Sequence, residues 1–132
     1  MTAMLSILLP TDFSENSMNA IKYALEFFKY EKTTFYLMHA YQNEFYDHED
    51  LKSREEFESV LEGITNQSRN NLKILLKKVK ELPPNPNFNY HTISAYNVLV
   101  EECNLLSKAN NIDLIVMGTR GKSDERHIVF GS

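Results

Sequence analysis

The 132 residues are enough for one domain with a buried core, which predicts a single domain over residues 1–132. The content of 42% hydrophobic and 24% charged residues is ordinary for a globular protein, and a net charge of −4 disfavours nucleic-acid binding through a basic surface. No apolar stretch approaches the roughly 20 residues that span a membrane, and a single cysteine permits no internal disulfide. With no secretory signal at the N-terminus, these features predict a cytoplasmic protein without nucleic-acid or membrane partners.

The first third of the chain predicts a strand, a helix and a second strand. Residues 4–9 form an apolar run, and Asp12 or Ser14 can cap the helix that follows. Within residues 18–28, apolar side chains recur every three to four positions, so one face of this helix meets a sheet. Residues 33–40 are rich in types that favour strands. Together these elements predict a right-handed βαβ unit with parallel strands.

A polar stretch and a long helix come next. Residues 41–56 contain the cluster Asp47-His48-Glu49-Asp50, but its ligand spacing is unconvincing for a metal, so no metal site is predicted. Residues 57–79 keep a helical apolar period over six turns. Four lysines near the C-terminus of this helix suit the helix dipole, and we interpret them as a solvated face rather than a nucleic-acid patch: Lys73, Lys77, Lys78 and Lys80.

The last third predicts a strand, a helix and another strand. Residues 87–94 alternate in polarity, as expected of a strand at the edge of a sheet. Ser94 or Asn97 can start the next helix, and Cys103 lies on its apolar face, which predicts a buried structural thiol. Residues 112–117 form an apolar run typical of a strand covered on both faces. The alternation of strands and helices predicts an α/β sandwich with helices on both faces of the sheet.

Glycines after the fourth strand indicate a phosphate-binding loop. Gly118 and Gly121 are followed, after nine intervening residues, by Gly131-Ser132. Glycine lets the backbone turn sharply and approach a ligand, and the N–H groups exposed in such turns bind phosphate. The spacing disfavours a P-loop, which needs a glycine at the position of Val116. Ligands of such sheets bind beyond the carboxyl ends of the strands, where the strand order reverses.

With these elements placed, the chain resembles the universal stress protein family along essentially its whole length. The resemblance rests on Ile7–Ser14, on a strand that ends in His39-Ala40, on Asp113–Gly118, and on the spacing Gly-x2-Gly-x9-Gly-Ser. It implies a Rossmann-like sandwich with four parallel strands in the order 3-2-1-4. The family's fifth parallel strand has no counterpart before Ser132, which predicts a domain truncated relative to the family. The fourth strand would then be an exposed edge or be covered by a partner chain.

The resemblance also implies a bound adenine nucleotide: ATP, ADP or AMP. In nucleotide-binding members the aspartate after the first strand contacts the ribose, the backbone after the second strand reads the adenine, and the glycine signature holds the phosphates. Whether Mg²⁺ accompanies the nucleotide is left open. The residues that this implicates in binding are Pro10, Thr11, Asp12, Ala40, Met117, Gly118, Arg120, Gly121, Gly131 and Ser132.

The sequence leaves three functional hypotheses. The leading hypothesis is a nucleotide-binding regulatory module of the stress response, acting as a homodimer or beside a second tandem domain, whose binding would order residues 122–130. The second is a slow ATP hydrolase, for which His127 and Asp124 are the only candidate bases near the phosphate-binding glycines, both expected in a mobile loop. The third is a nucleotide-free interaction protein. One departure from the family is Tyr96, near a position commonly held by glycine, where it could crowd or stack on a ligand.

Overall fold

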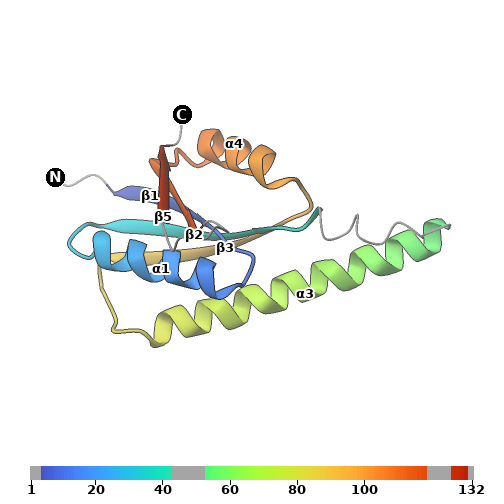
Figure 1. Cartoon of the computed structure of the whole chain (residues 1–132), viewed down its shortest axis with the longest axis horizontal. Coiled ribbons are helices and arrows are strands. Elements are labelled where there is room, and N and C mark those ends of the chain that lie inside the picture. The colour runs from blue at the N-terminus through green and yellow to red at the C-terminus, as the bar shows by residue number, and fades with distance from the viewer. Residues whose placement is uncertain (1–3, 43–52, 119–125, 131–132) are drawn as a thin grey trace.

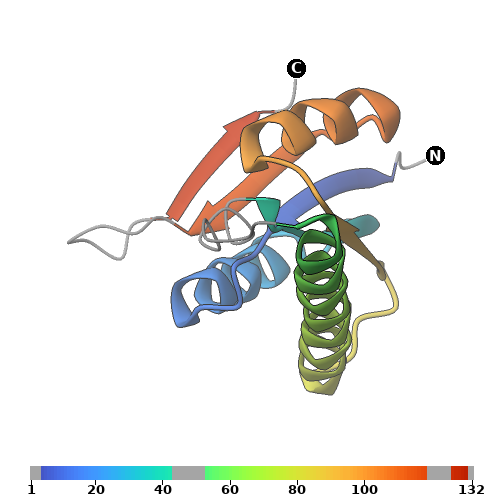
Figure 2. The same cartoon turned by 90° about the vertical axis from the view of Figure 1, so that its right-hand side faces the viewer.

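A computed structural model describes residues 4–42, 53–118 and 126–130 of the chain. Strands and helices alternate as predicted, and the ends of most elements other than β2 differ from the predicted ones by a few residues. The elements are β1 (Leu5–Pro10), α1 (Glu15–Phe27), β2 (Thr33–Ala40), α3 (Arg54–Glu81), β3 (Phe88–Ala95), α4 (Leu99–Ala109), β4 (Leu114–Gly118) and β5 (Arg126–Phe130). Helices α1 and α3 lie on one face of the sheet and α4 lies on the other, which confirms the predicted sandwich (Figures 1 and 2).

The sheet has the strand order β3-β2-β1-β4-β5. Strands β1, β2, β3 and β4 are parallel, with Ile7 of β1 opposite Phe35 on one side and Leu114 on the other. This confirms the order 3-2-1-4 and places β3 at an edge, as the sequence predicts. The direction in which successive strands are added reverses between β1 and β4, so a crevice opens at their carboxyl ends.

The fifth strand is antiparallel and is not predicted by the sequence. It pairs with β4 so that Met117 lies opposite His127 and Gly118 opposite Arg126. Two expectations are therefore wrong: β4 is not an exposed edge, and residues 126–130 are not part of a loop. The reason is that β4 offers unpaired backbone groups on one side, and a chain reversal lets residues close in sequence satisfy them.

Both faces of the sheet bury apolar side chains, because successive residues of a strand point to opposite faces. Within β1, Ile7 and Leu9 face α1 and α3, and Leu8 faces α4. The larger core, between the sheet and the two helices, includes Ile21, Ala24, Phe28, Phe35, Leu37, Leu72, Leu75, Val79 and Val116. The smaller core under α4 includes Met38, Cys103, Ile112 and Ile115, which confirms the predicted burial of Cys103.

The ends of α4 only partly match the prediction. Ser94 belongs to β3, and the N-cap of α4 is Val98, which makes no side-chain capping bond. Asn97 instead donates from Nδ2 to Glu102 Oε1 at 3.0 Å, so it tethers the first turn from one residue further out. The C-terminal end is as predicted, since Asn110 is the C-cap and Asn111 takes a left-handed φ of 51°.

Helix α3 is longer than the sheet needs. Its 28 residues span about 42 Å at 1.5 Å per residue, and its N-terminal part extends past the sheet (Figure 1). The buried positions Ser68, Leu72, Leu75 and Val79 all belong to the C-terminal half. Residues 53–59 are exposed. Packing against the sheet therefore stabilises only the C-terminal half of this helix.

Candidate functional site

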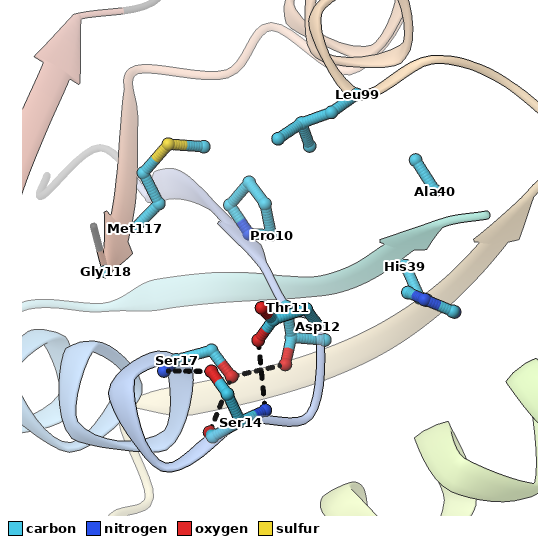
Figure 3. A pocket seen from close by; sticks show the side chains of 10 residues that line it. All are labelled: Pro10, Thr11, Asp12, Ser14, Ser17, His39, Ala40, Leu99, Met117 and Gly118. Atoms are coloured by element: carbon cyan, nitrogen blue, oxygen red, sulfur yellow. Dashed lines mark hydrogen bonds between the residues drawn. The ribbon is translucent and has the colours of Figure 1, made fainter. Parts of the chain in front are cut away.

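A cavity of about 150 Å³ lies at the carboxyl ends of the central strands, in the crevice between β1 and β4. It is formed by residues from five elements, β1, α1, β2, α4 and β4, and from the turn after β1 (Figure 3). All six of the implicated residues that the structure describes line it. The lining residues are Pro10, Thr11, Asp12, Ser14, Ser17, His39, Ala40, Leu99, Met117 and Gly118.

One wall of the cavity is polar and comes from the turn between β1 and α1. Asp12 is exposed, and its Oδ1 accepts a hydrogen bond from the backbone N–H of Ser14 at 3.0 Å. Ser14 is the N-cap of α1, because its Oγ accepts from the N–H of Ser17 at 3.2 Å. Of the two capping candidates, Ser14 therefore caps the helix, and Asp12 shapes the turn before it. One carboxylate oxygen of Asp12 is thus held by the turn.

Two buried hydroxyl groups strengthen the same turn. Thr11 Oγ1 accepts from the N–H of Phe13 at 3.0 Å and lies 2.9 Å from Ser17 Oγ. Because the Ser17 hydroxyl donates to the Ser14 carbonyl at 2.9 Å, the Thr11 hydroxyl is the donor in the Thr11–Ser17 pair. Phe13 has a φ of 66°, a conformation that costs a non-glycine residue energy and persists only where surrounding contacts hold it. These bonds supply such contacts.

The opposite wall is apolar. Pro10, Ala40, Met117 and Leu99 come together there from three strands and the start of α4 (Figure 3). Leu99 is the first residue of α4 and is 38% exposed, although it is a large apolar side chain. Sequence reasoning missed Leu99, Ser14 and Ser17 as site residues. An exposed leucine at a helix start facing the crevice is a signal that only the fold reveals.

His39 is buried and bonded away from the polar wall. Its Nδ1 lies 2.8 Å from Ser68 Oγ, and Ser68 Oγ lies 2.8 Å from Ser94 Oγ, so β2, α3 and β3 share one polar chain. The ring also meets Phe13 edge-on, with the centroids 4.6 Å apart. Figure 3 shows the ring directed away from Asp12. This arrangement makes His39 a structural residue of the sheet–helix interface.

Several predicted residues do not line the cavity or cannot be placed. Tyr96 stacks on Tyr41, with centroids 6.0 Å apart and an angle of 15° between the rings, and is not among the residues that line the cavity. The expectation that Tyr96 crowds a ligand is therefore not supported by its position. The remaining implicated residues and the acidic cluster lie outside the described residues: Arg120, Gly121, Gly131, Ser132 and Asp47–Asp50.

Two other features are absent from the part of the chain that the structure describes. Among residues 4–42, 53–118 and 126–130, no three histidine, cysteine, aspartate or glutamate side chains gather as a metal site would require. Within the same ranges, no helix is both long and apolar enough to cross a bilayer.

Comparison with known proteins identifies the class. The model of the universal stress protein family matches residues 4–132, and the chain belongs to this family. It is 27% identical over 138 aligned residues to universal stress protein MJ0577 of Methanocaldococcus jannaschii, covering 96% of this chain and 83% of that protein.

Solved structures agree with this assignment. The structure of MJ0577, presented as a structure-based assignment of biochemical function, aligns with a TM-score of 0.70 at 24% identity, covering 89% of this chain and 76% of that one. The universal stress protein UspA of Lactobacillus plantarum aligns with a TM-score of 0.64 at 16% identity, covering 89% of this chain and 81% of that one. At these identities the likeness of the solved structures establishes the fold alone.

Proposed function

We propose that this universal stress protein domain binds an adenine nucleotide in the crevice between β1 and β4 and acts as a regulatory module. One observation carries the proposal. Asp12, Ala40 and Gly118, which the family resemblance implicates from three separate segments, line a single cavity at the point where the strand order reverses. Such a point is where open α/β sheets bind their ligands.

The two walls suit the two ends of a nucleotide. The base would lie against the apolar wall, where Leu99 and Met117 offer contact area and the Ala40 backbone offers polar groups. The ribose would lie beside Asp12, whose carboxylate can accept hydroxyl bonds. The phosphates would extend past Gly118 towards the glycine signature, close to the N-terminus of α1, where the positive end of a helix dipole favours anions.

The size of the cavity limits how much of a nucleotide the described residues can enclose. Small-molecule pockets usually measure about 300–1,000 Å³, and the described residues enclose about 150 Å³. A nucleotide would therefore extend beyond the described walls. The rest of the glycine signature follows Gly118 in the sequence, so it is the segment we assign to the phosphates.

We propose binding rather than rapid turnover. A general base must lie within hydrogen-bond reach of the water that it activates. We assign the Asp12 carboxylate to the ribose rather than to the phosphates, and His39 is bonded through Nδ1 to Ser68, on the side away from the polar wall. His127, a candidate in the sequence, lies in β5 opposite Met117, in a strand rather than in a loop. We further propose that the protein acts in the cytoplasm.

The test is to identify what the protein carries. Nucleotide would be released from freshly purified protein by denaturation and identified by mass spectrometry, for the parent and for Gly121→Val. We expect ATP, ADP or AMP from the parent and none from the variant. ATP titration by calorimetry, with and without Mg²⁺, would follow, together with an assay of phosphate release. A parent that carries no nucleotide and gives a flat titration would refute the proposal.

A further inference from the structure

Helix α3 carries a second row of residues besides those that face the sheet. The row repeats with alternating steps of three and four, the spacing that keeps side chains on one face of a helix. Successive residues of a helix are about 100° apart around its axis, so this row lies roughly a quarter of a turn around the helix from the buried positions. We call it the α3 stripe: Phe57, Val60, Ile64, Gln67, Asn71, Ile74 and Lys78.

The stripe carries apolar side chains in both halves of the helix, and most of them are partly or largely exposed. Ile74 is 48% exposed and Phe57 is 40% exposed, and Val60 and Ile64 are half-buried. Near the C-terminal end the stripe borders a hollow of about 230 Å³ between α1 and α3, lined by Met18, Asn71, Ile74 and Lys78 among others. Near the N-terminal end it lies on the part of α3 that extends past the sheet (Figure 1). The apolar face of another helix could pack against the stripe at either end of α3.

The two halves of α3 carry opposite charge. Residues 54–68 contain one arginine and four glutamates, and residues 69–80 contain five basic residues and no acidic one. A helix dipole explains charges only within the first and last turns. Glu62, Arg69 and Lys73 lie further inside, so the dipole does not explain the full separation. A partner surface with the opposite arrangement would explain it.

We propose that two copies of this chain associate through the α3 stripe, with their α3 helices antiparallel. An antiparallel copy reverses the order of charges, so the acidic half of each helix meets the basic half of the other. The stripe can also pair with its own copy when the two-fold axis passes near Gln67, so that the Gln67 residues of the two copies face each other. In that register Val60 faces Ile74 of the second copy, Ile64 faces Asn71, and Phe57 and Glu56 approach Lys78 of the second copy. A two-fold axis creates every such contact twice.

This arrangement also gives the extending part of α3 a packing surface. Isolated helices shorter than about 12–15 residues are marginal in water, and most helical stability in proteins comes from packing. The 14 residues from Arg54 to Gln67, which precede the first buried position of the helix, would pack against the α1–α3 side of the second copy. The polar Gln67 and Asn71 at the centre would favour one register over others, as buried polar residues do in coiled coils. The proposal does not depend on nucleotide binding.

The decisive experiment is a charge exchange, followed by sedimentation velocity over a range of concentrations. Glu56→Lys and Lys78→Glu should each weaken self-association by roughly tenfold, because two ion pairs become two repulsions. The double variant, Glu56→Lys with Lys78→Glu, should regain the parental association. Residues 56 and 78 are about 33 Å apart along one helix, so only contact between copies can produce this rescue. A parallel pairing of the helices would not be rescued.

A second pair of variants tests the apolar part. Ile74→Glu should abolish the dimer, and Leu105→Glu on α4 is the matched control, since Leu105 is also a large exposed side chain, at 59%. Circular dichroism would verify that both variants remain folded. Three results would overturn the proposal: a parent that stays monomeric at all concentrations, a dimer that Ile74→Glu leaves intact, or charge variants that the double exchange fails to rescue.

Discussion

Gly118 lies against the first turn of α1, so close that a β-carbon added to it would stand 2.7 Å from the backbone oxygen of Asn16. The carbonyl carbon of Asn16 would be 3.0 Å away and the N–H nitrogen of Ser17 3.4 Å away. These neighbours are backbone atoms, which cannot rotate aside. Gly118 therefore allows β4 and α1 to approach and fixes two sides of the cavity relative to each other. This role does not require a ligand.

Replacing Gly118 by alanine should destabilise the protein. The β-carbon forces β4 and α1 apart, and overpacking of this kind costs about 1–3 kcal/mol. Urea denaturation would measure the free energy of unfolding. Gly63→Ala is the matched control, because a β-carbon at Gly63 in α3 meets nothing within 4 Å. That variant should gain about 0.5–1 kcal/mol from the better helix propensity of alanine. Equal effects at the two glycines would show that the contact with Asn16 is unimportant.

Replacing Asp12 by asparagine should weaken nucleotide binding without weakening the fold. Asparagine keeps a side-chain oxygen that can accept from the N–H of Ser14, but it loses the charge and one acceptor. A hydrogen bond to a charged group contributes about 1.5–3 kcal/mol, so affinity for ATP should fall by roughly tenfold or more. Calorimetric titration would measure the affinity, and thermal unfolding would report the fold.

The control for Asp12 is Glu15→Gln. Glu15 is an exposed acid in the first turn of α1 and is not among the residues that line the cavity. Its replacement changes the net charge by the same amount at nearly the same place. If both variants lost affinity equally, or if both bound better because negative charge was removed near the phosphates, a direct contact between Asp12 and the ribose would be disproved.

Replacing Ser68 by alanine should destabilise the interface between the sheet and α3. Ser68 is 1% exposed, and its hydroxyl lies within bonding distance of both His39 and Ser94. Removal of a buried hydrogen-bonding partner costs about 1–3 kcal/mol. Ser59→Ala, on the exposed part of the same helix, should be neutral or slightly stabilising, and chemical denaturation would compare the two. Identical free energies of unfolding would indicate that the chain of hydroxyl groups contributes nothing.

The buried thiol predicts a pH dependence. Burial, with the charge of Glu102 as a second cause, raises the pKa of Cys103 from 9.0 to about 11. In the unfolded chain the thiol therefore ionises at lower pH than in the folded protein. Between pH 9 and pH 11 the unfolded state has lost a proton that the folded state keeps, so stability falls as the pH rises. Below pH 9 the contribution is fully present, and its loss amounts to about 2 kcal/mol.

Cys103→Ala isolates this effect. Unfolding would be measured from pH 7 to pH 11 for parent and variant, and the difference between them should shrink above pH 9. Burial also raises the pKa of Tyr90, but this residue is present in both proteins and cancels in the difference. A thiol reagent at pH 8 should react slowly with the folded parent. A difference that stays constant with pH would contradict the assignment.

The sequence predicts the parallel core well because that core depends on local patterns. Apolar runs mark strands covered on both faces, and helical periods mark α1, α3 and α4, so order and fold class follow from pattern and resemblance. Pro10, Asp12 and Ala40 could be assigned to one edge of the sheet because carboxyl ends of parallel strands lie together. The bounds of Thr33–Ala40 agree with β2 residue for residue.

What the sequence did not predict depends on contacts between distant segments. Leu99 joins the cavity only because α4 begins beside Pro10 and Met117, which no local pattern reveals. The sequence does not predict β5, because the glycine spacing within residues 118–132 indicates a phosphate-binding loop, although Ile128-Val129-Phe130 are strand-forming residues. Gly118 was assigned to phosphate alone, and its contact with Asn16 becomes visible only once β4 and α1 are packed.

The central position of β1 also constrains how the chain folds. Ser6 and Asp113 are bonded to each other twice, from the Ser6 N–H to Asp113 Oδ2 and from the Asp113 N–H to the Ser6 carbonyl, each at 2.8 Å. During synthesis β1 can pair with β2 early, but its other edge waits until β4 has emerged more than one hundred residues later. Contacts so distant in sequence slow folding and leave an apolar strand edge open in the nascent chain. The central strand of the finished sheet is therefore the one that needs protection for longest.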